Sequence, residues 1–378
     1  MPGLLPISVY RTCFGLRWSF QPSGRRIAPI RRQTKALRAE NRAIVRGKMT
    51  TKAAELIELW RGGLKESTHH GHIVISDAHG IVEAWGDPTA VIFPRSSCKM
   101  LQALPLMESG AADQAGLSSR ELALACASHS GAAIHTEGVA RWLGGLGLAD
   151  GDLRCGVHMP RDPVENKRLT CSGEAPCQIH NNCSGKHAGF LTLNQHLKGG
   201  SEYVELDHPV QKAVRAAFEE MTGETAKGWG IDGCSAPNFA CTIEGLSRAM
   251  ARFATPGAGA RGEAIRRLYD AMVAHPELVA GEGRACTELM RATAGRVAVK
   301  TGAEAVFVAA IPEMGLGIAL KIIDGGTRGS EAAITALLVH LGLLDKAHPM
   351  AMKHLYAPHT NWRGKKTGEM RTAPGFPS

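Results

Sequence analysis

The 378-residue chain contains no run of 18 or more apolar residues, so its sequence indicates no membrane-spanning helix. It also contains no internal repeat and no low-complexity segment beyond its first 48 residues. No continuous apolar stretch follows the first arginine, so a secretory signal fits poorly. Without such a signal the ten cysteines do not indicate a disulfide framework, and we expect a reduced, cytoplasmic protein.

Net charge is nearly absent from most of the chain. The formal charge of +9 arises in residues 1–48, where eleven basic residues and one acid give +10 and leave −1 for the rest. This near neutrality argues against a nucleic-acid partner. We expect residues 1–48 to be a basic, disordered extension. Alternatively, they result from a start codon assigned upstream of Met49, the natural first residue. Residues 49–378 are expected to form a single domain.

The apolar pattern predicts strands near both ends of the chain and helices between them. Ile73–Ile75 and Ile81–Trp85 form one predicted hairpin, which Val91–Phe93 is expected to extend. Val306–Ala310 and Leu316–Ile322 form another. We therefore predict an α+β fold, with one antiparallel sheet built from both chain ends and a helical middle region.

Local signals divide the middle region. A helix is expected to begin at Ser96 and to be kinked or shortened by Pro105. Ser118 and Glu121 have the spacing of a capping box. Residues 151–182 are rich in Gly, Pro, Asn and Cys and are predicted to form long loops, while Lys365–Ser378 is predicted to be a loose tail.

The first candidate for chemistry is the S-S-C-K run at residues 96–99, which is an S-x-x-K motif at a predicted strand-to-helix junction. Positions i and i+3 share a helix face. A lysine there can accept the serine proton if burial and a neighbouring cation lower its pKa. The free N–H groups of the first helical turn can help to hold an oxyanion. A capping serine followed by a solvated lysine is the ordinary alternative, because the motif alone is common by chance.

Three further stretches carry polar groups in small-residue surroundings. K-T-G at residues 300–302 follows S-x-x-K in the order of penicillin-recognising serine enzymes. Cys126–Gly131 contains Ser128 and His129. His180–His187 and Gly230–Pro237 contain Cys183 and Cys234, which can share a metal, although the spacing matches no zinc finger and buried thiols are the plainer interpretation.

Taken in order, these stretches resemble the asparaginase II family, the Ser-Lys, metal-binding asparaginases. The resemblance spans roughly residues 55–367 and is carried by E-L-W-R-G-G at 58–63, P-R-S-S-C-K at 94–99, C-A-S-H-S-G at 126–131, residues 180–189, residues 230–237, K-T-G-A-E at 300–304 and N-W-R-G at 361–364.

The resemblance implies a fold like the serine β-lactamases and glutaminases, a homodimer, and hydrolysis of L-asparagine to L-aspartate and ammonia. It implies two Ser-Lys tandems, with Ser96 as nucleophile beside Lys99 and with Ser128 beside Lys300 relaying protons. Which serine attacks stays open, with Ser97 as a further alternative.

The resemblance also implies a metal site and a substrate site. Cys183, Lys186 and Cys234 would hold zinc, which would modulate substrate binding. Arg95 and Asp232 would hold the charged ends of the substrate.

Two residues depart from the family pattern. Ala305 stands where glycine is expected, and Cys286 where an acidic residue is expected. Both lie close in sequence to the second tandem, so the shape of the site can differ while every proposed catalytic group is kept.

Three other functions compete with asparagine hydrolysis. A glutaminase would use the same chemistry. A penicillin-recognising serine hydrolase shares S-x-x-K and K-T-G, but the chain has no S-D-N triplet and no recognised export signal. The non-enzyme alternative is a zinc-binding structural protein built on the cysteine-rich middle.

Overall fold

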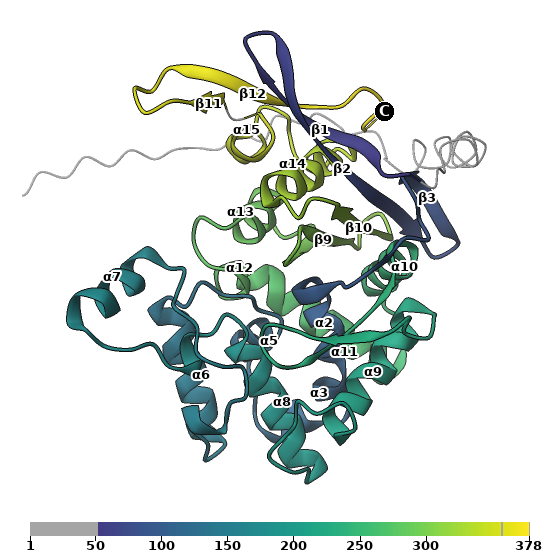
Figure 1. The fold of residues 1–378 in the computed structure, drawn as a ribbon. Coiled ribbons are helices and arrows are strands. Elements are labelled where there is room, and N and C mark those ends of the chain that lie inside the picture. Colours follow the sequence, from purple (N-terminus) through teal and green to yellow (C-terminus); the bar gives the residue numbers. More distant parts are fainter. Residues whose placement is uncertain (1–51, 357, 378) are drawn as a thin grey trace, which may run out of the picture. The chain divides into compact units, whose positions relative to one another are not determined.

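The computed structural model describes residues 52–356 and 358–377, and Figure 1 shows their arrangement. The expected extension, residues 1–48, lies outside the described residues. Antiparallel pairing orders the main sheet as β11 (Pro358–Thr360), β12 (Lys366–Thr372), β1 (Ala54–Arg61), β2 (Leu64–Asp77), β10 (Leu316–Ile322), β9 (Val306–Ile311) and β8 (Ala298–Gly302), and β3 (Gly80–Trp85) also pairs with β2.

The sheet confirms the prediction that both chain ends build one antiparallel layer. Asp77 pairs with Gly80 at the first predicted hairpin, and Leu316 pairs with Ile311 at the second. N-terminal β2 pairs directly with C-terminal β10, so residues more than 230 positions apart, such as Ile75 and Ile318, are neighbours. This non-local pairing joins the two ends of the described chain.

Helices fill the sequence between the two halves of the sheet. Their bounds are η1 (Arg95–Cys98), α2 (Lys99–Gln102), α3 (Leu104–Glu108), α4 (Ala111–Gln114), α5 (Ser119–Ala125), α6 (Ala133–Gly145), η2 (Asp150–Asp152), α7 (Pro163–Ser172), η3 (Gln178–His180), α8 (Ser184–Leu197), α9 (Pro209–Thr222), α10 (Ile243–Ala254), α11 (Gly259–Ala274), α12 (Pro276–Val279), α13 (Ala285–Ala292), α14 (Thr327–His340) and α15 (Pro349–His354). Helix α10 packs against β2, β9 and β10, and α14 packs against β1, β9 and β10.

Local chemistry explains where several helices begin. Ser118 and Glu121 form the predicted capping box at the start of α5. Pro105 lies in the first turn of α3, so the chain breaks into α2 and α3 as expected.

Three predictions were wrong. Val91–Ile92 forms β4, which pairs with β7 (Cys241–Thr242) in a small separate sheet, because the left-handed Gly86 and the turn after it lead the chain away. The segment 151–182 contains α7, which Asp162 caps by accepting from the Val164 and Glu165 N–H groups.

The third concerns the C-terminal segment. It is no loose tail, because β12 pairs with β1, where Met370 lies opposite Leu59 and is buried. Its short alternating pattern is stabilised by the neighbouring strand, which the local sequence does not reveal.

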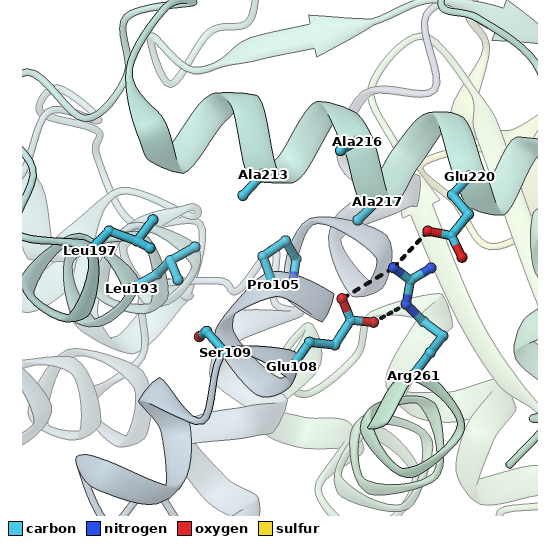
Figure 2. A pocket seen from close by; sticks show the side chains of 10 residues that line it. All are labelled: Pro105, Glu108, Ser109, Leu193, Leu197, Ala213, Ala216, Ala217, Glu220 and Arg261. Carbon is cyan, nitrogen blue, oxygen red and sulfur yellow. Dashed lines mark hydrogen bonds and ion pairs between the residues drawn. The ribbon is translucent and has the colours of Figure 1, made fainter. Parts of the chain in front are cut away.

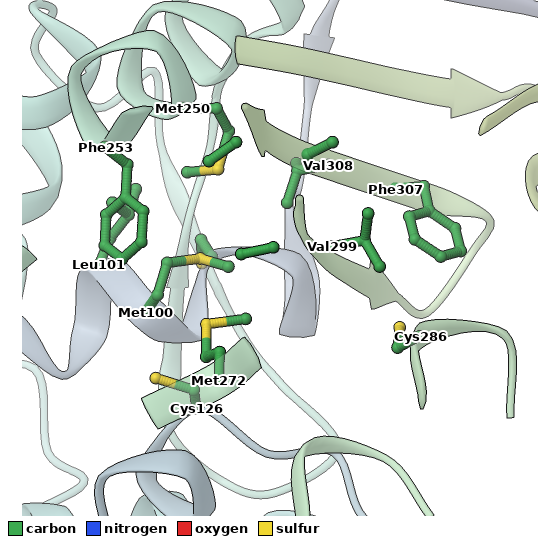
Figure 3. Close-up of a cluster of buried hydrophobic side chains, with 14 of the residues drawn as sticks. Met100, Leu101, Cys126, Met250, Phe253, Met272, Cys286, Val299, Phe307 and Val308 are labelled. Atoms are coloured by element: carbon green, nitrogen blue, oxygen red, sulfur yellow. The ribbon is translucent and has the colours of Figure 1, made fainter. Parts of the chain in front are cut away.

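A buried apolar cluster supports both motif lysines (Figure 3). Met100 follows Lys99 and packs in a cluster with Leu101, Met250 and Phe253, and Val299 precedes Lys300. All are buried. Since successive residues of a strand point to opposite faces, Val299 and Lys300 point to opposite faces of β8, and both faces are buried there.

Among the described residues, no helix combines the length and the apolar character needed to cross a membrane.

Candidate active site

The S-x-x-K motif occupies a tight turn. Arg95 has a left-handed backbone with φ of 54°, a conformation that is costly for a residue with a side chain. Its N–H donates to Asn238 Oδ1 at 3.3 Å, which helps to hold the turn. Ser96 follows and is half-buried, and its hydroxyl has no hydrogen-bond partner among the described residues. The neighbouring Ser97 is fully buried and donates to the Pro94 carbonyl at 2.7 Å, so its hydroxyl has a structural partner.

Lys99 is buried one turn beyond Ser96. Its Nζ donates to the Ala127 carbonyl and to Cys183 Sγ, the latter at 3.1 Å. The first tandem is therefore adjacent in sequence, but its lysine is hydrogen-bonded to other groups in this structure.

The second tandem is directly bonded. Lys300, on β8, is fully buried, and its Nζ lies 2.8 Å from Ser128 Oγ and 2.8 Å from the Thr301 carbonyl. Burial lowers the pKa of Lys300 from 10.5 to about 7, and the nearby Lys99 and Arg284 cations act in the same direction. An amine with this pKa can exchange a proton with a serine hydroxyl near neutral pH.

The two motifs approach each other through a glycine. A Cβ at Gly302 would lie 2.6 Å from the Pro94 carbonyl oxygen and 3.0 Å from the Ser97 nitrogen. Only glycine allows β8 to come this close to η1, which explains the last residue of K-T-G.

The expected metal ligands also converge. Lys186 Nζ donates to Cys234 Sγ at 3.0 Å, and Cys183 and Cys234 are both buried. A hydrogen bond from the Cys183 thiol lowers the pKa of Cys234 well below its usual value, against burial, which raises it. The same bond raises the pKa of Cys183 to about 12. Burial lowers the pKa of Lys186, but the two sulfurs outweigh this and raise it.

This donor set fits zinc, which favours sulfur and nitrogen ligands. Two thiolates and one amine would hold the ion after Cys183 and Lys186 lose their protons. In the described part of the chain, no group of three His, Cys, Asp or Glu side chains is arranged for a metal, so the lysine is needed to complete the set.

Arg95 and Asp232 form an ion pair. Arg95 Nη2 and Nε lie 2.8 and 3.1 Å from Asp232 Oδ1. Burial raises the pKa of Asp232, but the bond from Arg95 and the nearby Lys186 outweigh it, so the pKa falls below its usual value. Lys186 and the adjacent Cys234 connect this ion pair to the group formed by Cys183, Lys186 and Cys234, which we call the sulfur cluster.

His129 is a structural residue. Its Nδ1 accepts from the Gly131 N–H at 3.2 Å, and its Nε2 lies 2.9 Å from Ser184 Oγ. Burial lowers its pKa well below the usual value, so the ring is neutral. Of the Ser-His candidates in Cys126–Gly131, only Ser128 joins the lysine cluster.

Both departures from the expected pattern are explained. Ala305 has φ of 56°, in the left-handed region where the expected glycine would be unstrained. Cys286 is buried and its Sγ accepts from the Thr301 N–H at 3.2 Å. Burial raises its pKa, so a neutral thiol lies near Lys300 where a carboxylate is expected.

Sequence reasoning missed several residues near the second tandem. Ser130 Oγ, His158 Nδ1 and Arg284 Nη1 are buried polar atoms without a hydrogen-bond partner. Ser130 lies inside the stretch Cys126–Gly131, and Arg284 lies two residues before Cys286, but nothing in the sequence marked them as unpaired.

A separate groove lies between α3, α8, α9 and α11 (Figure 2). Its volume is about 290 Å³, and it is lined by Pro105, Glu108, Ser109, Leu193, Leu197, Ala213, Ala216, Ala217, Glu220 and Arg261. None of the lysines, cysteines or serines of the two tandems and the sulfur cluster lines it, so the groove is distinct from the candidate active site.

The sequence matches the L-asparaginase II family over residues 57–372. The chain therefore belongs to this family and is an amidohydrolase. Comparison with curated proteins finds no match.

Solved structures with similar coordinates share little sequence with the chain. The protein called Mglu has 14% identity and a TM-score of 0.40, covering 84% of this chain and 76% of that one. The probable glutaminase of Bacillus subtilis in complex with 6-diazo-5-oxo-L-norleucine has 13% identity and a TM-score of 0.34, covering 86% and 99%.

Proposed function

We propose that this amidohydrolase acts on L-asparagine, releasing L-aspartate and ammonia by Ser-Lys nucleophilic catalysis. The observation that carries the proposal is the buried contact between Lys300 Nζ and Ser128 Oγ at 2.8 Å. Because the pKa of this amine is about 7, the pair can accept and return a proton at neutral pH. Family membership supports the substrate.

Ser96 is the proposed nucleophile. It is less buried than Ser97 and Ser128, and its hydroxyl is free of other partners among the described residues. Lys99 lies one turn away and would take the Ser96 proton after turning from the Ala127 carbonyl. An apo geometry of this kind does not rule out a base, because catalytic hydrogen bonds often form only with substrate bound.

The proton balance follows from these assignments. Ser96 Oγ attacks the side-chain amide carbon and its proton passes to Lys99. The Ser128–Lys300 pair delivers a proton to the amide nitrogen, the C–N bond breaks and ammonia leaves. Water then adds to the carbonyl carbon of the Ser96 ester and gives a proton back to the Ser128–Lys300 pair. The ester C–O bond breaks, Lys99 returns its proton to Ser96 Oγ, and L-aspartate is released.

Zinc and a second subunit belong to the proposal as well. Zinc held by Cys183, Lys186 and Cys234 would supply a Lewis acid near the substrate and would modulate its binding. Asp232 would hold the substrate ammonium, and Arg95 would fix the orientation of the Asp232 carboxylate. A cytoplasmic homodimer remains the expected form of the enzyme.

Three assays together test the function: ammonia release from L-asparagine, ammonia release from L-glutamine, and hydrolysis of nitrocefin. Ser96→Ala should lower kcat by several orders of magnitude while the melting temperature is kept. Ser97→Ala is the matched neighbour and should keep most of kcat, because its hydroxyl is bonded to the Pro94 carbonyl. Normal turnover in folded Ser96→Ala would contradict the nucleophile. Turnover of glutamine or nitrocefin but not asparagine would contradict the substrate.

A further inference from the structure

Arg284 carries a positive charge that no described carboxylate neutralises. It caps α13 at its N-terminal end, and its side chain makes no hydrogen bond or ion pair among the described residues. Its Nη1 is completely buried and has no partner in the described part of the chain. A buried guanidinium nitrogen without an acceptor is costly, so its place in the fold calls for a ligand.

Other arginines of the chain show the usual solution. Arg261, beside the groove in Figure 2, bonds Glu108 and Glu220 through Nε and Nη2, so its charge is neutralised even though its Nη1, like that of Arg284, has no partner among the described residues. Arg291, on the same helix α13, bonds Glu282 at 2.8 Å and Glu277 at 3.3 Å. Both glutamates pair with Arg291, and neither forms an ion pair with Arg284.

Two further unpaired groups lie in the segments around Arg284. Ser130 is buried, and its Oγ has no partner. A Cβ at Gly281 would lie 2.4 Å from Ser130 Oγ, so the turn leading to Arg284 is packed onto that hydroxyl. The Arg161 N–H donates to the Ser130 carbonyl at 2.7 Å, which brings the segment of His158, also unpaired at Nδ1, to the same place.

This group of unpaired atoms adjoins the second tandem. The Ser128 N–H donates to the Val279 carbonyl at 2.9 Å, so the segments around Ser128 and Val279 lie side by side. Arg284 is close enough to Lys300 to help lower the pKa of its ammonium. Arg161 adds a second cation, and the neighbouring Asp162 is engaged in capping α7.

We propose that Arg284 and Ser130 form a carboxylate subsite that binds the α-carboxylate of the amino-acid substrate. This assignment rests on the proposed amidohydrolase function. Arg95 is less suited to the task, because its charge is already neutralised by Asp232 at 2.8 Å. A guanidinium and a hydroxyl supply the donors that a carboxylate accepts from. Asp232 uses only Oδ1 in its bonds with Arg95, so its Oδ2 is the atom left for the ammonium end.

The test compares enzyme charge with substrate charge. Arg284→Gln, Arg284→Lys and Arg291→Gln are assayed with L-asparagine and with L-asparagine methyl ester, which lacks the carboxylate charge. Arg284→Gln should raise KM for L-asparagine by about 100-fold, the effect of losing a charge-assisted bond. Its kcat/KM for the methyl ester should stay within about threefold of wild type. The KM of Arg284→Lys for L-asparagine should lie between those of wild type and Arg284→Gln. Arg291→Gln should match wild type on both substrates.

Each outcome decides the assignment. An equal loss on both substrates would mean a structural role and would overturn the subsite, as would an unchanged KM for L-asparagine. If wild type hydrolyses no amino-acid amide, the proposed function fails separately. The subsite is then tested by calorimetric titration with L-aspartate. Binding at least about tenfold weaker to Arg284→Gln supports it, whereas equal binding, or none to wild type, overturns it.

Discussion

Replacing Lys300 by methionine should remove one source of pH dependence from the free energy of unfolding. Burial lowers the Lys300 pKa from 10.5 to about 7 in the folded protein, whereas the unfolded chain keeps the ordinary value. Between these values the unfolded chain binds more protons, so wild-type stability rises with pH and is lost as pH falls toward 7. Methionine has a similar length and no proton to exchange.

The magnitude follows from the size of the pKa difference. A difference of about 3.5, at about 1.4 kcal/mol for each pKa unit, gives roughly 5 kcal/mol over the whole range, as an order of magnitude. Lys300→Met also leaves Ser128 Oγ and the Thr301 carbonyl without their bonds, at about 1–3 kcal/mol each. That loss is the same at every pH and leaves the slope unchanged.

Urea unfolding at pH 7, 8 and 9 measures the slope. The free energy of unfolding of wild type, minus that of Lys300→Met, should rise by about 1.4 kcal/mol for each pH unit. Lys212→Met removes an exposed lysine, with 63% of its side chain accessible, and its difference from wild type should stay flat. If the Lys300→Met difference is also flat from pH 7 to 9, Lys300 is charged in the folded protein and the proton-exchange argument fails.

Three other predictions follow from the same cluster. kcat/KM should fall as pH rises through about 7, since the charged Lys300 ammonium is the form that delivers a proton to the amide nitrogen; a rate independent of pH from 6 to 8 would contradict this. Cys286→Asp should move that midpoint upward by about one pH unit or more, because a carboxylate favours the charged amine; an unchanged midpoint would show that position 286 does not affect Lys300. Cys234→Ala should lose bound zinc, measured by metal analysis, and raise KM while sparing most of kcat; if kcat falls as far as in Ser96→Ala, the metal is catalytic rather than modulatory.

Periodicity and turn chemistry were sufficient for much of the fold. The two hairpins at opposite ends of the chain, the capping box at Ser118 and the break at Pro105 depend on residues close in sequence, so local rules located them. Helix α7 was missed although Asp162 and Pro163 are a standard helix start, because the loop-like composition of residues 151–182 outweighed that signal.

The sequence by itself determined the family, the sheet from both ends and the residues that meet in the candidate site, because motif blocks and alternation are local. Tertiary structure decided the contacts. It pairs Lys300 with Ser128, turns Lys99 toward Cys183, and gives β12 a partner in β1. It alone shows that Arg284 has no counter-ion among residues 52–356 and 358–377, because pairing and burial depend on segments far apart in the chain, and these also set the pKa values.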